Sequence, residues 1–414
     1  MRRNFFAAGL LLLAPLSALA QPAVSPSGPT ACPSEAHDGA LAADHADGSR
    51  LHVEADYLFW FLKPNRIATP ILATVIDPTE DLAATLEAGG LADPNARVLF
   101  GGRNRDRGPY SGLAARVSWD LDDDGTAAEL GGLWLPLQGN HYRIASNANG
   151  QPPLTLPFFV PEGVEGVPAG ETAGTFAGLF NGAPLTGQVD IHTATQLWGG
   201  DVNLAVGLYR GDGWRLQGLG GFRYLGLNDL LQIDAAVTNS TGGSTFDRFY
   251  TENNFYGGQL GVRLVGDFGR LRPSLTSKVA LGATIETLDI TGNAVLPSNA
   301  VPPAGTAQLP GGFYTASSNI GRSTHSEFAV VSETNFSVSA NVSERVSFTL
   351  GYSFLYWSNI LRSGDQITRV INPNLNPAFS TFGTPGQGPA QPARLNKETD
   401  FWAHGLNAGI EIRF

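Results

Sequence analysis

The sequence has almost no cysteine, and this excludes two kinds of protein. Cys32 is the single cysteine among 414 residues, so neither an intramolecular disulfide framework nor a thiolate-rich metal site can form. The single methionine, Met1, likewise argues against a methionine-rich binding groove.

Charge is also scarce, and basic charge most of all. Charged residues make up 15% of the chain, and 26 Lys and Arg oppose 37 Asp and Glu, for a net charge of -11. Because an acidic chain offers no extended basic surface, nucleic acid is not expected as a partner. No run of 18 apolar residues follows the N-terminus, which excludes a protein built from several membrane-spanning helices. The hydrophobic residues, 42% of the total, are therefore dispersed.

The N-terminus has the layout of a secretory signal. Two arginines precede an apolar stretch, 5–20, that closes on small residues. This pattern predicts a signal peptide over 1–20, cleaved after Ala20; the stretch is too short for a good spanning anchor. Residues 21–50 are rich in Pro, Ala, Ser, Asp and His without periodicity, which predicts a disordered periplasmic leader.

From residue 51 onward, apolar and polar residues alternate. In 345–356 the even positions carry large apolar or aromatic side chains, and the odd positions are mostly small and polar. The same period of two recurs in 113–121, 271–286 and 401–414. Successive side chains of a strand point to opposite faces, so these segments are predicted strands with one apolar face.

A soluble β-sandwich would also alternate, but the polar face distinguishes the two folds. Here it is dominated by Gly, Ser, Thr and Asn with widely spaced Arg and Glu, which suits a narrow lumen better than a water-exposed surface. Aromatics such as Trp119, Trp214, Tyr224 and Tyr256 stand near strand ends, as in the aromatic girdles of membrane barrels. We therefore predict an all-β fold over 51–414, a single transmembrane antiparallel β-barrel.

Turns and loops give the strand count. Tight polar turns at 122–125, 210–213, 267–270 and 342–345 alternate with long connections at 63–109, 138–196, 227–252, 293–324 and 359–400. Short periplasmic turns and long extracellular loops are typical of bacterial outer-membrane barrels. The predicted strands are 51–62, 110–121, 126–137, 197–209, 214–226, 253–266, 271–292, 325–341, 345–358 and 401–414. Alternation within 229–237 leaves twelve strands as the alternative to ten.

Several segments resemble a known family. They are Glu54 to Leu62 (EADYLFWFL), Gly221 to Leu227 (GFRYLGL), Phe246 to Phe249 with Asn253 to Gly261, Gly351 to Arg362 (GYSFLYWSNILR), and Gly364 to Ile367 with Ile371 to Pro373. Over roughly 52–414 the chain resembles the beta-barrel porin family numbered seven. The resemblance implies an outer-membrane barrel with a transport role. Ser363 and Thr368 depart from the family, which tends to carry Pro and Asp there.

Charged residues recur on the predicted lumen face. The lumen-lining candidates are Arg116, Glu129, Asp201, Arg215, Arg223, Arg263, Lys278, Glu286, Glu327, Glu333, Arg345, Glu411 and Arg413, together with Asp56. Near-equal numbers of opposite charges predict pairing between neighbouring strands, because charges in a small lumen must neutralise one another or face water. They could form a selectivity filter or a structural ladder.

The last strand carries the predicted assembly signal. Phe414, Ile412 and Ile410 share its apolar face, and a terminal amphipathic strand of this kind is what the barrel assembly machinery recognises. The expected partners are that machinery, outer-membrane lipid, and small solutes or ions.

Two functions compete, and neither needs a cofactor. The first is a passive channel or porin, not an enzyme, with a narrow charge-lined lumen in the bacterial outer membrane. The second is a structural or adhesive barrel with a plugged lumen, acting through its extracellular loops.

A barrel protease would need histidines and carboxylates gathered at the rim, and His325 and His404 bring no carboxylate motif. Asp365 and Asn372 are expected to form turns rather than to bind a cation. No metal is expected.

Overall fold

The computed structural model describes residues 50–77, 80–84, 87–102, 108–122, 125–239, 242–296, 307–384 and 388–414. The predicted signal peptide and all of the predicted leader but its last residue lie outside these ranges and stay predictions. Ordered structure in the described residues is strand, apart from two short 3-10 helices, η1 (Ser363–Asp365) and η2 (Pro373–Leu375). No helix in the described ranges is long and apolar enough to cross a membrane.

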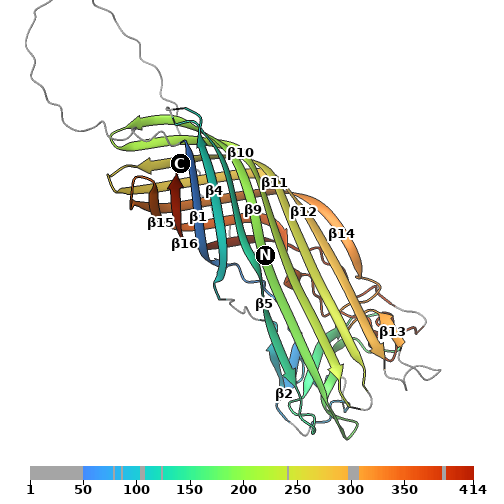
Figure 1. Cartoon of the computed structure of the whole chain (residues 1–414). Coiled ribbons are helices and arrows are strands. Elements are labelled where there is room, and N and C mark those ends of the chain that lie inside the picture. Colours follow the sequence, from blue (N-terminus) through green and yellow to red (C-terminus); the bar gives the residue numbers. More distant parts are fainter. Residues whose placement is uncertain are drawn as a thin grey trace, which may run out of the picture. The chain divides into compact units, whose positions relative to one another are not determined.

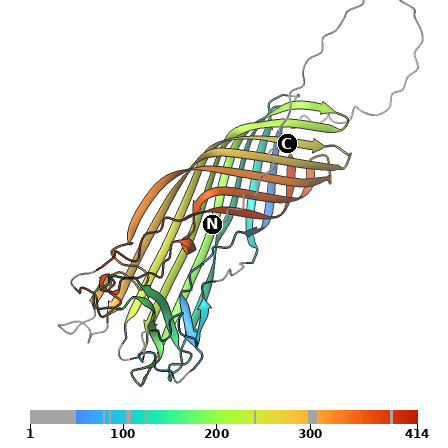
Figure 2. The ribbon, with the colours of Figure 1, turned by 180° about the vertical axis from the view of Figure 1, so that it is seen from behind.

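Ten long strands form a closed antiparallel ring (Figures 1 and 2). They are β1 (Leu51–Leu62), β4 (Tyr110–Asp120), β5 (Ala127–Ala145), β9 (Gly187–Gly211), β10 (Trp214–Val237), β11 (Ser244–Gly266), β12 (Leu271–Leu296), β14 (Gly321–Asn341), β15 (Val346–Leu361) and β16 (Glu398–Arg413). Each pairs with the next in this order, and β1 pairs with β16 from His52↔Arg413 to Leu62↔Ala403, which closes the ring. The predicted ten-stranded barrel is confirmed.

The two faces of the wall follow the alternation. On β15, Leu350 is 55% exposed on the outer face, whereas Ser353 on the inner face is buried. On β12, Leu281 is 55% exposed and Lys278 is buried. The outer surface is therefore an apolar band suited to lipid, and the polar side chains gather inside.

At one rim the turns that the structure describes are tight, as predicted. Asp212 and Gly213, both with positive φ, join β9 to β10. A two-residue turn of this kind matches the right-handed twist of a hairpin, and glycine adopts its second position without strain. Both ends of the ring, Leu51 and Phe414, are hydrogen-bonded to each other at this same rim.

The strands reach further beyond the opposite rim than predicted. The segments 138–145, 187–196 and 227–237 were expected to be loop but continue β5, β9 and β10. Ile191 on β9 and Leu231 on β10 point inward and are fully buried, and Tyr142 and Ile144 on β5 are partly buried against the same cluster. The alternation therefore continues where the wall covers further apolar side chains. The alternation in 229–237 belongs to β10 itself, which rules out the twelve-stranded alternative.

The long loops contain a second sheet that the sequence did not predict. It has the order β3-β2-β6-β7-β8. Its strands are β2 (Leu72–Val75), β3 (Ala96–Phe100), β6 (Leu154–Val160), β7 (Gly170–Phe180) and β8 (Ala183–Leu185), and a further strand, β13 (Ala307–Pro310), pairs with the end of β12.

Loop residues from this region fill the extended end of the ring. Apolar side chains of 67–72, 154–177, 313–314 and 361–371, segments that we call the plug, form one buried cluster with the inner faces of β9, β10, β11 and β12. Phe158 and Phe313 of this cluster meet edge to face, and the partly buried Phe379 packs against both, with ring centroids 4.9 to 5.6 Å apart. Burying each such side chain contributes roughly 1.5–3 kcal/mol, so the plug is a folded core rather than a loose cover.

Candidate functional site

The interior of the ring near the tight-turn rim holds a polar cavity of about 280 Å³. Its lining comes from the inward positions of β1, β4, β5, β9, β10, β11, β12, β14, β15 and β16. Nine of the thirteen predicted charges line it: Arg116, Glu129, Asp201, Arg215, Arg223, Arg263, Lys278, Glu333 and Glu411. This clustering follows from strand periodicity, because every second residue of a barrel strand points inward.

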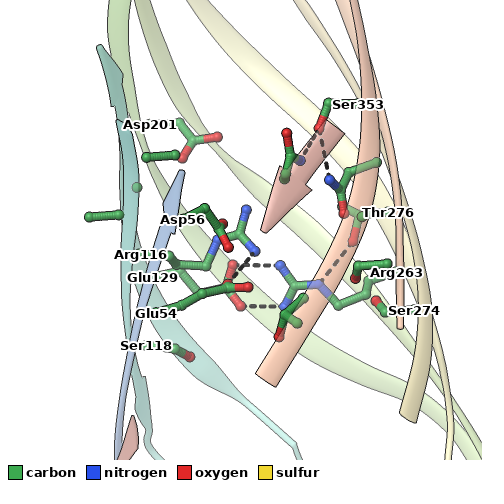
Figure 3. A pocket seen from close by; sticks show the side chains of 18 of the residues that line it. Glu54, Asp56, Arg116, Ser118, Glu129, Asp201, Arg263, Ser274, Thr276 and Ser353 are labelled. Carbon is green, nitrogen blue, oxygen red and sulfur yellow. Dashed lines mark hydrogen bonds and ion pairs between the residues drawn. The ribbon is translucent and has the colours of Figure 1, made fainter. Parts of the chain in front are cut away.

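The charges pair across the cavity. Arg263 on β11 donates to both carboxylate oxygens of Glu129 on β5, and the Nη2 to Oε2 distance is 2.8 Å (Figure 3). In the ring, β9 and β10 lie between those two strands. The predicted pairing of neighbouring strands is therefore wrong for this pair, since the narrow lumen lets long side chains reach the opposite wall.

Two more pairs cross the lumen in the same way. Arg223 on β10 contacts Glu333 on β14, and Lys278 on β12 contacts Asp201 on β9. Lys278 also lies 3.6 Å from Glu333, which joins the two pairs. All four side chains are at most 13% exposed. Such pairs are stable only when both members are present, because either charge alone would be buried without compensation.

Other pairs do join neighbouring strands, among them Lys278 and Glu333, which are register partners on β12 and β14. Arg116 on β4 lies 3.5 Å from Glu54 on β1, its register partner, and Figure 3 shows both side chains turned into the cavity. Glu54 was missing from the predicted set, although it shares the parity of Asp56 and alternation alone could have identified it. His52, near the rim, contacts Asp120 at 3.1 Å and Glu411 at 3.3 Å and was also missed.

Four of the thirteen predicted charges do not line the cavity. Arg345 is exposed in the turn that precedes β15, and Arg413 bonds Glu411 at 3.2 Å close to the same rim. Glu327 lies on β14, on the face of buried Ala329. Glu286 is fully buried on β12, and neither carboxylate oxygen has a hydrogen-bond partner.

An apolar layer borders the cavity on the side of the plug. Its buried side chains come from all ten strands of the ring, and none is more than 7% exposed. Trp357 and Phe255 meet edge to face at its centre, with ring centroids 6.1 Å apart. The indole of Trp357 donates to Thr284 at 3.0 Å, so even its polar atom is satisfied inside the layer. Every strand of the ring therefore contributes apolar side chains at this level.

A buried polar network lies beyond this layer. Arg362 and Asp229 form an ion pair, and Arg362 also donates to the backbone oxygen of Lys63 at 3.2 Å. Asn253 accepts from the backbone nitrogen of Leu361 at 2.7 Å. These contacts tie the loop after β15 to the inner faces of β10 and β11. Alternation could not identify Arg362, because it lies just outside a strand.

The remaining candidates are separate from one another. His404 faces outward, 2.7 Å from the Tyr352 hydroxyl, whereas His325 is on β14 opposite Glu286. The structure therefore does not bring the two histidines together. Asn372 accepts from the backbone nitrogen of Asn374 at 3.0 Å, which is a turn. Asp365 pairs with Lys397 at 3.0 Å.

A closed ring of ten strands, apolar outside and charged inside, defines an outer-membrane β-barrel. The chain belongs to the family described as Putative beta barrel porin-7 (BBP7), whose model matches residues 52–414. Its location is thus the outer membrane, and lipid surrounds its outer face. No curated protein matches the sequence.

Several solved structures are similar to the chain. The outer-membrane protease OmpT from Escherichia coli matches with 9% identity and a TM-score of 0.38, over 90% of this chain and 99% of that one. The toluene transporter TodX from P. putida has 9% identity and a TM-score of 0.16, over 89% and 91%. An anion-selective porin from Comamonas acidovorans has 12% identity and a TM-score of 0.14, over 88% and 98%.

Proposed function

We propose that the protein is a narrow passive channel of the outer membrane and that the described conformation is its closed state. The observation that carries this proposal is the apolar layer, to which every strand of the ring contributes. On one side of the layer lies the charged cavity, and on the other side lies the plug. Solutes or ions can pass only when the layer and the plug separate from the wall.

The cavity would set which ions pass once the layer opens. Its charges are held in opposite pairs, Arg263 with Glu129 and Lys278 with Asp201. Paired charges leave little net field in the lumen, so the open channel should have small conductance and weak selectivity. The proposal assigns no chemical step to the protein, and its transported substances are small polar solutes or ions.

The packing of the plug favours a second candidate, a permanently closed barrel that acts through its external loops. Tyr314 is fully buried in the plug and donates to the backbone oxygen of Ile71 at 2.9 Å. Arg369 pairs with Glu171 in the same region. A core this well satisfied can hold a fixed surface for an external partner without ever opening.

Conductance of the purified full chain in planar bilayers separates the two candidates. The double variant W357A/F255A removes the centre of the apolar layer, and we expect it to raise the frequency of ion-conducting events about tenfold or more over the wild type. L350A is the matched control, because it truncates an apolar side chain on the lipid face. Silence of both the wild type and the double variant, with the barrel folded, would refute the channel and leave the second candidate.

A further inference from the structure

Two histidines and an aspartate meet on the outer surface of the extended wall. His141 on β5 faces its register partner His192 on β9, with ring centroids 4.0 Å apart. Asp190 lies two residues before His192 on the same face, and its Oδ1 is 2.8 Å from His141 Nε2. One ligand atom from each of the three residues lies within 4.8 Å of the others. This cluster is separate from the lumen.

The strand geometry produces this arrangement without any loop. Residues two apart on a strand share a face, and a directly opposite residue on the neighbouring strand has its Cβ about 4.5–5.5 Å away. Three ligands can therefore converge from two strands. On tetrahedral zinc, two nitrogen ligands at about 2.0–2.1 Å from the metal lie about 3.3 Å apart, so small side-chain rotations would bring these three onto one ion.

The cluster lies above the apolar band. Val202, Leu204 and Val206 mark the lipid-facing part of β9, and Asp190 and His192 precede them by ten residues or more. On β5 the exposed Leu137 lies four residues before His141, so at about 3.3 Å per residue the site lies about 13 Å beyond the last exposed large apolar side chain of that strand. His141 is 46% exposed, so an ion from the aqueous phase can reach the site.

The surrounding charges also favour a cation. Asp190 is the register partner of Asp234 on β10, and both line one cavity of about 230 Å³. Like charges directly opposite each other on neighbouring strands destabilise a sheet. The guanidinium of Arg143, 3.6 Å from Asp190, offsets part of this repulsion but is 59% exposed and is also bonded to Gln188 at 2.9 Å.

We propose that His141, His192 and Asp190 bind a borderline divalent cation of the zinc, copper or nickel class on the outer surface of the barrel. Imidazole nitrogen selects these ions, whereas calcium and magnesium prefer oxygen ligands. Three protein ligands leave a coordination position for water or for a group on an external partner. The bound ion would crosslink β5 to β9 just beyond the irregular pairing of β5 between Leu135 and Gln138. The proposal does not depend on whether the lumen conducts.

The test is equilibrium dialysis of the detergent-solubilised full chain with zinc, followed by elemental analysis. The protein carries no polyhistidine tag, and H37A/H45A serves as the reference because the leader has two histidines of its own. We expect one equivalent of zinc on this reference. Adding H192A or H141A should lower its affinity about tenfold or more, since changes even in the outer shell of metal sites cost about 10–100-fold.

Two further variants make the test specific. R143A should raise zinc affinity about two- to fivefold. The Arg143 guanidinium competes with zinc for Asp190, and losing one surface ion pair has an effect of about this size. H404A, which removes another outward-facing histidine, should leave affinity unchanged. The proposal is overturned if H37A/H45A protein binds no zinc, if H192A binds as tightly as the reference, or if calcium competes at equal concentration.

Discussion

Arg362 and Asp229 form an ion pair whose side chains are 2% and 0% exposed, in the interior of the ring. The Arg362 guanidinium also lies 5.4 Å above the ring of Phe401. The pair links the start of the last long loop to β10, beside the apolar layer. It is therefore one of the contacts that hold the plug to the wall.

Removing one member of this pair should be strongly destabilising. R362A leaves Asp229 buried without a counter-charge, and we expect a loss of about 3–5 kcal/mol in the free energy of unfolding, measured by urea titration in detergent micelles. The double variant R362M/D229L, which replaces the pair by apolar groups, is the control and should recover most of the loss. Equal stability of R362A and wild type would contradict a structural role for the pair.

The pair of Arg263 and Glu129 predicts both stability and selectivity. R263E places two carboxylates in contact across the lumen, where the partners are 14% and 4% exposed. We expect R263E to lower the free energy of unfolding by about 3–5 kcal/mol, and the swapped pair R263E/E129R to restore it. Reversal potentials of any conducting protein should shift toward cations in R263E alone. If R263E keeps full stability and only selectivity changes, the charges line water instead of bracing the wall.

Charged substitutions on the lipid face should lower the free energy of unfolding by an amount that depends on their depth in the bilayer. Leu281 and Leu350 are each 55% exposed on the outer face, so replacing either by Arg should cost roughly 2–4 kcal/mol if it lies near the bilayer midplane. At inward-facing Gly282 the limit is space, because an added Cβ would lie 2.0 Å from the backbone oxygen of Tyr256. Reversible unfolding in lipid vesicles measures both effects. Losses below about 1 kcal/mol for both leucines would refute the assignment of faces.

Asp247, outside the membrane-spanning part of β11, predicts a pH dependence. Burial raises its pKa to about 7, although hydrogen bonds from Thr315, Phe313 and Tyr314 oppose the rise. A carboxyl whose pKa is raised by folding stabilises the fold below its unfolded pKa of about 3.9, and this contribution is lost as the pH rises through about 7.

Hydrogen exchange of the segment 307–320 checks this dependence. After correction for the intrinsic exchange rate, we expect greater protection at pH 5 than at pH 8 in the wild type. D247N cannot ionise and should show a smaller difference between the two pH values. Equal protection of the wild type at pH 5 and pH 8 would show that Asp247 does not titrate in this range and would contradict the raised pKa.

Alternation predicted the ring because each strand residue has only two directions to point. Lys278 and Leu281 differ by an odd number of positions, and this alone assigned them to opposite faces. The same alternation identified nine charges that line the cavity, but it did not show which of them pair with one another. Which residue Arg263 meets depends on the diameter and shear of the closed ring, and neither quantity is encoded in any local pattern.

The plug escaped prediction for a different physical reason. Its segments are rich in Pro, Gly and Asn, which usually indicate exposed loop, and its strands are short. A signal was present in the apolar run LTLPFFV of β6 and in the adjacent aromatics Phe313 and Tyr314. Such side chains in a loop need a surface to bury them. The inner faces of β9 to β12 supply that surface only after the tertiary structure has formed.

The wall is much higher on one side than on the other, and this constrains the order of folding. Strands β9 to β12 have 23 to 26 residues, whereas β1 and β4 have 12 and 11 (Figures 1 and 2). Successive hairpins of the tall side are local in sequence, but pairing of His52 with Arg413 closes the ring across nearly the whole chain. Local contacts form fastest, so the tall side should form first and the plug should condense late against it. Substitutions in the plug should then accelerate unfolding while leaving the rate of insertion almost unchanged.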